Sequence, residues 1–546
     1  MGKKMISEEE SDTLIKFKDR PDGDRFDSDC SSASASNETS TKFKDKLHGD
    51  DYDSDCSSLS SASDATSTTD DDAPVESEQE PENDYENGGY HPVSFGDVFH
   101  SRYFTMRKLG WGHFATVWLA FDTRERIFTA IKIPKSRQDF IEASRDELDI
   151  LQVIRDGDPR HVGAQNVVQI LNEFEFFGVS KSLHLCMVFE VLGDNLLTLL
   201  RRFNTLNLNL VRVVSKQLLQ GLAYLHDECE IIHTDIKPEN VVICLTEGQL
   251  RNLALEAYSS RLWDKKPKSM ISTSPEEYRS KYILGLPSKK RKHIRRIRKK
   301  HRNKVEQFLS KLDIADSPPK KQIENGTNNA NDRSDFSYEA YNHISSFYEE
   351  LQAGNLGALK NCTIKIVDFG NACYIDHHYS DDIQTREYRS PEVIIGCEYD
   401  TSADLWSAAC LIFELVSGDY LFYPEASDSD NYNSDDDHIA KIIETLGPLP
   451  VRLFRDGRRF NDIFDKRGKL LKIKVLSPVS IGELLIDIAS LPGIEARDLS
   501  EFLMPMLQYD INERATASEC LKSKWLKLCE IRGTTKPKRR DTIELV

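Results

Sequence analysis

Short apolar runs separated by turns dominate the chain from about residue 90 to residue 193. Their β-branched and aromatic content predicts strands, over 102–112, 115–122, 128–134, 167–176 and 183–192. Residues 139–154 instead place apolar side chains at helical spacing, which predicts a helix. We therefore expect a small lobe, residues 88–193, with a five-stranded sheet and one helix.

After residue 194 the pattern changes to apolar residues at helical spacing. This spacing predicts buried or amphipathic helices, over 195–203, 211–228 and 403–422. Residues 246–361 interrupt this helical body with a basic run and a stretch rich in Ser, Pro, Asn and Gly. Because such a long loop is uncommon inside a compact domain, we interpret 246–361 as a mostly disordered spacer between 194–245 and 362–532.

The two ends of the chain differ from this body. Residues 1–90 hold 25 acidic and 9 basic residues, which places −16 of the net charge of −18 in that segment. Residues 1–87 are poor in large apolar side chains, so we expect a disordered acidic tail. The tail repeats KFKD and DSDCSS with a period of 26 residues. Residues 533–546 are expected to form a loose C-terminal tail.

Several classes of protein are excluded by composition. No stretch approaches the roughly 18 consecutive apolar residues of a membrane span, and the first residues lack the apolar core of a signal peptide. The eleven Cys residues are dispersed without a CxxC pair. This predicts reduced thiols rather than a disulfide framework or a zinc site. We expect a protein of the cytoplasm and nucleus.

Candidate chemistry begins with the glycine-rich sequence LGWGHFATV at Leu109. Gly110 and Gly112 would let backbone amides approach a phosphate, although this short pattern also fits an ordinary hairpin turn. The pattern is not isolated. Lys132 follows on the third predicted strand, where a cation needs a partner, and Glu147 on the next helix could supply it.

Four polar residues continue this series in the second half of the chain. IIHTDIKPEN supplies Asp235, Lys237 and Asn240, and IVDFGNA supplies Asp368. The order and spacing match the protein kinase signature set. Phosphoryl transfer depends on positioning and charge neutralisation. We expect Asp235 to accept the proton of a substrate hydroxyl and Lys237 to neutralise the moving phosphoryl group.

The same signature assigns the nucleotide and metal contacts. Asn240 and Asp368 offer oxygen ligands to Mg²⁺, a hard cation. Lys132 would hold the phosphates of ATP and Glu147 would orient it. The complete set of expected ATP-binding residues is Leu109, Gly110, Gly112, Val117, Lys132, Glu147, Glu190 and Leu192.

One departure from the signature concerns activation. Kinases controlled by loop phosphorylation usually have His-Arg-Asp, whereas this chain has Thr234 between His233 and Asp235. Without that Arg, a phosphate on the activation segment loses a cationic partner. We therefore expect activity without loop phosphorylation. Structural roles are expected for Asp404 and for a Glu392–Arg514 ion pair.

Longer segments carry a family resemblance. LGWGHFATVWLA, VFEVLGDNLL, HTDIKPEN, DFGNAC and QTREYRSPEV together resemble the SR-protein kinases, within the group that includes MAP and cyclin-dependent kinases. The resemblance covers about 90–245 and 362–532. It implies an α+β, bilobal protein-kinase fold with a β-rich N-lobe and a helical C-lobe, split by a spacer. It also implies constitutive, ATP- and Mg²⁺-dependent phosphorylation of serines in Arg/Ser-rich splicing factors.

The acidic region 419–444 bears on the substrate. Asp419, Asp437 and Glu444 stand at positions that match the docking groove of that family, and several carboxylates together would hold an Arg-rich peptide. The alternative is that the acidic run DDD only caps the following helix, with Asp437 and Lys441 as an ordinary i,i+4 pair.

Residues 289–304 contain eleven Lys and Arg and no acidic residue. They fit a nuclear-import signal, a nucleic-acid patch, a solvated linker, or an internal ligand that occupies the acidic groove and weakly inhibits. The run has no interleaved aromatic residues, which argues against sequence-specific RNA binding. We expect a monomer that binds Arg/Ser-rich proteins but neither nucleic acid nor membrane. One alternative is a related kinase with other substrates, for example proline-directed ones. The other is a pseudokinase scaffold, which would lack one of Lys132, Asp235, Asn240 or Asp368, and this chain retains all four.

Overall fold

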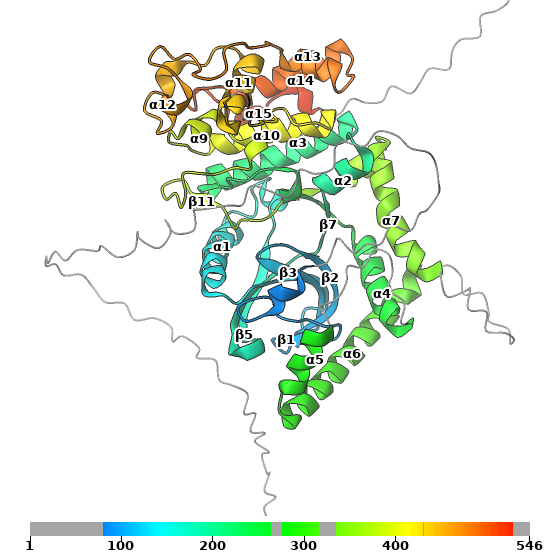
Figure 1. The fold of residues 1–546 in the computed structure, drawn as a ribbon. Helices are drawn as coiled ribbons and strands as arrows, with labels where there is room; N and C mark the ends of the chain where they lie inside the picture. Colours follow the sequence, from blue (N-terminus) through cyan, green and yellow to red (C-terminus); the bar gives the residue numbers. More distant parts are fainter. Residues whose placement is uncertain (1–79, 264–275, 317–334, 428, 430, 528–546) are drawn as a thin grey trace, which may run out of the picture. The chain divides into compact units, whose positions relative to one another are not determined.

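An antiparallel sheet of six strands forms the N-lobe of the computed structural model (Figure 1). The structure describes residues 80–263, 276–316, 335–427, 429 and 431–527, so residues 1–79 of the predicted acidic tail and the tail 533–546 lie outside the described residues, whereas residues 80–87 are described. The strand order is β1-β2-β3-β4-β6-β5. The strands and the helix that packs on them are β1 (Val98–Phe99), β2 (Tyr103–Trp111), β3 (Ala115–Asp122), β4 (Ile127–Pro134), β5 (Ile170–Phe177), β6 (Leu183–Phe189) and α1 (Gln138–Asp156).

Apolar side chains of β3 point alternately to the two faces of the sheet, and both faces are buried. Trp118 and Ala120 belong to the apolar cluster on one face of the sheet, whereas Leu119 and Phe121 belong to the cluster on the other. Successive strand residues point to opposite faces. The five predicted strands and the helix are confirmed. The sixth strand, β1, was not predicted, because two residues are too few to show a periodic pattern.

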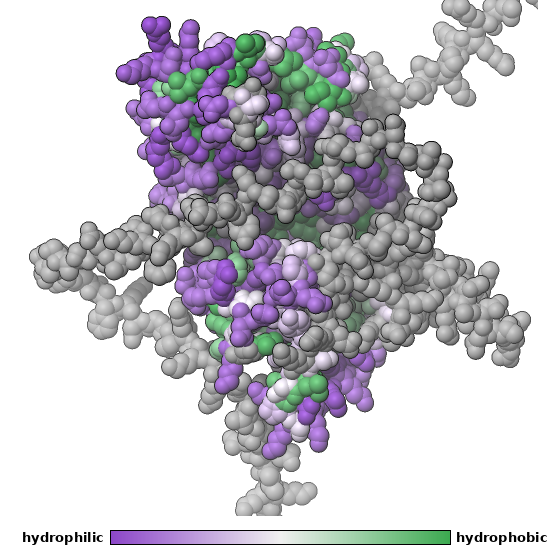
Figure 2. Space-filling model, viewed as in Figure 1, coloured by the Kyte–Doolittle hydropathy of each residue, from purple (hydrophilic) through white to green (hydrophobic). Residues whose placement is uncertain are grey.

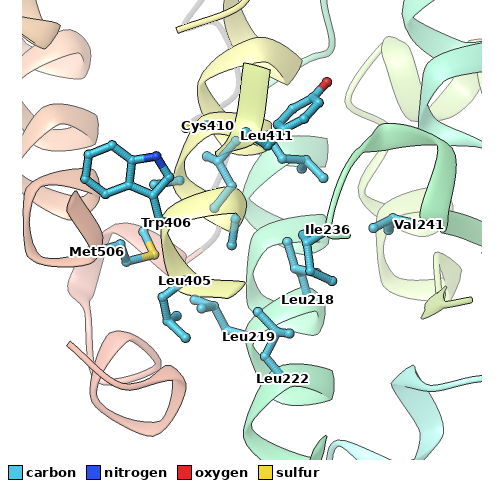
Figure 3. Close-up of a cluster of buried hydrophobic side chains, with 14 of the residues drawn as sticks. Leu218, Leu219, Leu222, Ile236, Val241, Leu405, Trp406, Cys410, Leu411 and Met506 are labelled. Atoms are coloured by element: carbon cyan, nitrogen blue, oxygen red, sulfur yellow. The ribbon is translucent and has the colours of Figure 1, made fainter. Parts of the chain in front are cut away.

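The C-lobe is helical and encloses the larger core. Every residue of α10 (Ser402–Ser417) is buried, and α10 packs against α3 (Leu208–Ala223). Figure 3 shows this contact, with Leu218, Leu219 and Leu222 facing Leu405 and Leu411. The other helices are α2 (Leu196–Phe203), α9 (Pro391–Ile395), α11 (Ser434–Leu446), α12 (Phe460–Ile463), α13 (Ile481–Asp487), α14 (Gly493–Leu503) and α15 (Ala517–Cys520).

Short strands lie at the junction of the two lobes and present the loops that carry the polar motif residues. Two small sheets have the orders β10-β9-β7 and β11-β8. Their strands are β7 (Leu192–Asn195), β8 (Ile231–Ile232), β9 (Val241–Cys244), β10 (Ile364–Ile366) and β11 (Cys373–Tyr374). Segments more than 120 residues apart in the sequence pair here, since Ile243 of β9 is opposite Ile364 of β10.

The spacer is more ordered than the sequence led us to expect. It contains α4 (Glu247–Trp263), α5 (Glu276–Gly285), α6 (Ser288–Asp316), α7 (Asp335–Gln352) and α8 (Leu356–Asn361). Its described helices contribute Ala254, Ala257, Val305 and Leu309 to the apolar cluster on the sheet face that holds Phe104. The expectation of a mostly disordered spacer is therefore wrong for these helices, because they bury apolar side chains against the N-lobe.

None of the helices among the described residues combines the length and the apolar character that a bilayer crossing needs. Hydrophilic residues cover most of the coloured surface in Figure 2, with small apolar patches between them.

Candidate active site

The loop between β8 and β9 holds the predicted catalytic carboxylate in a network of short contacts. Lys237 Nζ lies 2.9 Å from Asp235 Oδ2, and the Thr385 hydroxyl donates to Asp235 Oδ1 at 2.7 Å. Lys237 Nζ also donates to the Thr385 hydroxyl at 2.8 Å. Burial raises the pKa of Asp235, but Lys237 and Thr385 outweigh burial and hold the pKa below its ordinary value. The carboxylate is therefore ionised at neutral pH.

Asn240 closes the same loop from its C-terminal end. Its amide nitrogen donates to the main-chain carbonyl of Asp235 at 2.8 Å and to Asp235 Oδ2 at 3.2 Å. With the amide nitrogen engaged in this way, the side-chain oxygen of Asn240 is directed elsewhere. Asp368 follows β10 with a positive φ of 68°, and its side chain is about half exposed. These two oxygen donors fit a divalent cation that would complete its coordination with phosphate and water.

Lys132 and Glu147 meet as predicted, across the gap between β4 and α1. Lys132 Nζ donates to both carboxylate oxygens of Glu147, at 2.6 and 2.8 Å, and lies 3.9 Å from Asp368 Oδ1. Burial lowers the pKa of Lys132, but the carboxylates of Glu147 and Asp368 outweigh it and leave the pKa above its ordinary value. A charged ammonium thus connects the N-lobe sheet to the Asp368 loop.

The glycine-rich hairpin joins β2 to β3 beside Lys132. Val117 lies opposite Gly110 on one side and opposite Lys132 on the other, and Leu109 precedes Gly110 on β2. A Cβ atom at Gly110 or Gly112 would meet no atom within 4 Å. The protein itself therefore leaves these positions open, as expected if another molecule approaches the backbone there.

The last two predicted nucleotide contacts lie on the connection between the lobes. Glu190 follows β6, and Leu192 begins β7. The Glu190 carboxylate pairs with Lys365 Nζ at 2.7 Å and accepts a hydrogen bond from the Gln169 main-chain nitrogen at 3.3 Å. Its side chain thus ties the connection to β10.

A buried carboxylate beneath the catalytic loop explains the loop's conformation. Asp404 on α10 accepts hydrogen bonds from the main-chain nitrogens of His233 and Thr234, at 2.8 and 2.9 Å, and contacts His226 Nε2 at 2.8 Å. Thr234 has a positive φ of 70°, which is unfavourable for a β-branched residue. The two hydrogen bonds to Asp404 hold that strained conformation in place.

The site contains two residues that the sequence reasoning missed. Thr385 binds both Asp235 and Lys237, and Gln384 donates to the carbonyl of Ala403 at 2.8 Å while accepting from the nitrogen of Ser390 at 2.9 Å. Both stand in QTREYRSPEV, which carried the family resemblance. Their position directly before that motif's Arg was the available signal, but their contacts depend on the tertiary fold.

The acidic residues predicted to dock substrate have unequal surroundings. Asp419 is exposed, whereas Asp437 is buried, accepts from the main-chain nitrogen of Glu425 at 2.8 Å and lies 3.5 Å from Lys441 Nζ. Glu444, two turns further along α11, accepts from the nitrogen of Ser477 at 2.6 Å.

The capping alternative is correct in part. The N-terminus of α11 is capped by Asn433 and Asp436, which form a capping box, and Asp437 is not the cap. The predicted i,i+4 pair of Asp437 with Lys441 is present. The structure therefore gives Asp437 local structural contacts in a buried position at the start of α11.

The basic run 289–304 lies in α6, which packs against β1 and β2 of the N-lobe. Arg298 pairs with Asp97, and the His301 ring lies 3.1 Å from the Thr123 hydroxyl. Val305 and Leu309 hold the following turns in the apolar cluster. The hypothesis that this run occupies the acidic groove is contradicted, because the apolar side of α6 binds the N-lobe instead.

The fold and this site define a protein kinase. The family model described as "Protein kinase domain" matches residues 103–256 and 344–526, on both sides of the spacer. The chain is 38% identical over 513 residues to the "Serine/threonine-protein kinase spk-1" of Caenorhabditis elegans, which covers 83% of this chain and 51% of that protein. It is 36% identical over 517 residues to "SRSF protein kinase 3" of Homo sapiens, covering 83% of this chain and 91% of that protein.

A fungal relative, "Protein kinase dsk1" of Schizosaccharomyces pombe, is 36% identical over 474 residues, with 83% of this chain and 86% of that protein covered. The chain belongs to the SR-protein kinase family of serine/threonine protein kinases. It spans about half the length, 51%, of the two Caenorhabditis relatives it matches. The match to the protein kinase domain, together with the two lobes of the structure, confirms the bilobal α+β fold predicted from the sequence.

Proposed function

We propose that this chain transfers the terminal phosphoryl group of ATP to serines in Arg/Ser-rich proteins such as splicing factors, and so regulates mRNA splicing. The observation that carries the proposal is the assembled network of Asp235, Lys237 and Thr385 below the Lys132–Glu147 pair. The name of the human relative, SRSF protein kinase 3, supports the substrate class.

In this proposal, each polar residue has one task. The Asp235 carboxylate accepts the proton of the serine hydroxyl, and Lys237, 2.9 Å away, offsets the charge of the phosphoryl group in transit. Lys132 binds the phosphates of ATP while Glu147 holds it in place. Asn240 and Asp368 would hold Mg²⁺, which supplies charge neutralisation on the phosphates when bound.

We also propose that activity needs no phosphate on the activation segment. Thr234 is buried, and its hydroxyl donates to the carbonyl of Asn371 at 2.9 Å, so it offers no cation to a phosphate. The segment is held instead by Gln384, whose carbonyl accepts from Arg389 Nη2 at 2.9 Å and whose side chain binds α10. These contacts supply the ordering that phosphorylation gives other kinases.

The chain is proposed to act as a monomer in both cytoplasm and nucleus. The basic run of α6 could serve nuclear import, since Lys292, Arg295, Arg296, Lys299 and Lys300 are exposed while the apolar side of the helix is buried. A receptor that reads an extended basic peptide would have to unwind α6, whereas one that reads a charged helix would not.

One experiment tests substrate and activation together. Bacterially produced, phosphatase-treated protein is incubated with ATP, Mg²⁺ and either an Arg-Ser repeat peptide or a Ser-Pro peptide of equal length, with Asp235→Ala as the control. We expect rapid phosphorylation of the Arg-Ser peptide only, and a fall in kcat of about 10²–10⁴-fold in the control. Faster transfer to the Ser-Pro peptide, or a requirement for an upstream kinase, would contradict the proposal.

A further inference from the structure

Residues 80–93 form a strap that precedes the residues matched to the protein kinase domain, which begin at 103. The strap is firmly packed. Glu80 and Lys108 form a buried ion pair, and the Tyr85 hydroxyl donates to the Glu80 carboxylate. Gly89 has no room for a side chain, because a Cβ atom would lie 1.9 Å from the Asp84 carbonyl oxygen. The strap is therefore a built part of the N-lobe.

Tyr90, at the end of the tight turn in the strap, contacts the tip of the glycine-rich hairpin. Its hydroxyl donates to the carbonyl oxygen of Gly112 at 2.6 Å and lies 3.5 Å from that of His113. Within the hairpin, the Gly112 carbonyl otherwise accepts only a longer bond, 3.3 Å, from the Ala115 nitrogen. Burial raises the pKa of Tyr90 above its ordinary value, so the hydroxyl stays protonated and donates.

Lys135 joins the strap to the same hairpin. Its ammonium lies 4.6 Å from the centre of the Tyr90 ring and 3.0 Å from Asp84 Oδ2. Its main-chain nitrogen donates to the carbonyl of Phe114 at 2.9 Å. The Tyr85 ring packs edge-on against Tyr90 at 5.6 Å. The side chain of Tyr90 is thus held on several sides, and its hydroxyl has a fixed direction.

Peptide geometry converts this contact into control of the hairpin amides. The described chain contains no cis peptide bond, and in a trans peptide the carbonyl of one residue and the N–H of the next point in opposite directions. When Tyr90 holds the carbonyl of Gly112, the N–H of His113 must point away from Tyr90. The open space beside Gly110 and Gly112 leaves the backbone accessible to a ligand.

We propose that Tyr90 is a positioning residue, which holds the Gly112 carbonyl and so keeps the N–H of His113 directed at the phosphates of ATP. Preorganised backbone donors of this kind bind phosphate without first losing conformational freedom. The adenosine part of the nucleotide would gain nothing from Tyr90. The inference rests on the proposed use of ATP.

The test compares two single-atom deletions in the N-lobe. Tyr90→Phe removes the hydroxyl from Gly112, whereas the control Tyr103→Phe removes a buried hydroxyl that accepts from Asn172 Nδ2 at 2.8 Å, on β2 but away from the hairpin tip. Affinities for ATP and for adenosine are measured by calorimetry, and amide exchange of residues 112–115 by mass spectrometry. The loss of one hydrogen bond predicts a roughly fivefold weaker affinity for ATP in Tyr90→Phe, with an unchanged affinity for adenosine.

Faster exchange at 112–115 is expected in Tyr90→Phe but not in Tyr103→Phe. Equal ATP affinities in the two variants, or equal losses for ATP and adenosine in Tyr90→Phe, would overturn the proposal and leave Tyr90 with a packing role only. Failure of the wild-type protein to bind ATP would instead refute the proposed function, so the two failures are distinguishable.

Discussion

Two ion pairs of similar length, one in each lobe, differ in what they leave open. In the C-lobe, Arg514 contacts both oxygens of Glu392 at 2.7 and 2.8 Å, and neither side chain exposes more than 2% of its surface. In the N-lobe, Lys132 contacts both oxygens of Glu147 at 2.6 and 2.8 Å, yet the Lys132 side chain remains 20% exposed. The two ion pairs thus have similar lengths, but solvent and ligands can reach only Lys132.

The difference separates a structural pair from a functional one. Arg514 also donates to the carbonyls of Gln508 and Ser402, at 2.9 and 3.1 Å, so four of its five N–H donors are bound within the protein. Lys132 has three ammonium hydrogens, of which Glu147 needs two, and the third can reach a ligand on the open side near Asp368. A buried, paired cation holds the fold, whereas a partly open cation can bind substrate.

The largest effect is expected when the closed pair is broken. Arg514→Ala leaves the Glu392 carboxylate buried and unpaired, which should cost about 3–5 kcal/mol of unfolding free energy. Urea titration measures this loss. Arg514→Lys keeps the positive charge but cannot bind both oxygens of Glu392 in the same geometry. Its free energy of unfolding should lie between those of the wild type and Arg514→Ala. Wild-type stability in Arg514→Ala would show that the pair is not structural.

Breaking the open pair should change activity more than stability. Lys132→Met removes the cation that binds the phosphates of ATP in the proposed function, so kcat/KM should fall by about 10²–10³-fold. The unfolding free energy should fall less than in Arg514→Ala, because the side chain at position 132 is 20% exposed and its replacement lets water reach Glu147, whereas Arg514 is fully enclosed. Steady-state kinetics and urea titration of the same preparation measure both. A stability loss equal to that of Arg514→Ala would erase the distinction between the two pairs.

The same contrast explains which parts of the protein could be predicted from the sequence. The strands with alternating residues, such as 115–122, and the motif residues Asp235 and Lys132 were found because local patterns and fixed spacings carry their signal. Thr385 was missed, since it reaches Asp235 across 150 residues of sequence.

The missing parts of the fold have a related cause. The strap at 80–87 was assigned to the acidic tail because its composition is polar, yet Glu80 and Tyr85 are buried. Helix α6 is dominated by Lys and Arg, and only a few side chains, including Val305 and Leu309, attach it to the N-lobe. Composition averages hide such small numbers of anchoring contacts, so segments that fold only against a neighbour escape prediction.

Buried histidines in the two lobes should make the protein less stable in acid. Burial, with a smaller contribution from His184, lowers the pKa of His91 in the N-lobe to about 3, and burial lowers that of His438 in the C-lobe. At mildly acidic pH these histidines therefore stay neutral in the folded state but are protonated in the unfolded state. Their effect on the free energy of unfolding is negligible above pH 6.5, the ordinary pKa of histidine, and the free energy of unfolding decreases progressively as the pH falls from 6.5 towards 3.

For His91 alone, the loss between pH 7.5 and pH 5 should be about 2 kcal/mol. Urea titrations at the two pH values measure it. In His91→Phe the pH dependence should shrink by that amount, although His184 and His438 still contribute. The matched control is His293→Phe, which replaces an exposed histidine of α6. Equal behaviour of the two variants would show that His91 does not resist protonation.

The smallest effect is expected at two carboxylates of α11 that make local hydrogen bonds and are also predicted to dock substrate. Asp437 and Glu444 accept hydrogen bonds from the main-chain nitrogens of Glu425 and Ser477, so Ala substitutions would damage local structure as well as charge. Asp437→Asn combined with Glu444→Gln keeps an oxygen acceptor at each position and removes two charges. Exposed ion pairs contribute about 0.2–1 kcal/mol each, so KM for a long Arg-rich substrate should rise by about two- to thirtyfold.

Salt and substrate length distinguish docking from structural damage. Because a Debye length is about 8 Å at physiological ionic strength, the difference between the variant and the wild type should fade as salt is added. A short peptide that reaches only Asp235 should keep its KM. The matched control is Asp498→Asn with Glu501→Gln, which removes two exposed carboxylates from α14. If the control raises KM as much as the α11 variant, the effect is one of net charge; if the short peptide suffers equally, Asp437 and Glu444 act through the fold and the docking role is wrong.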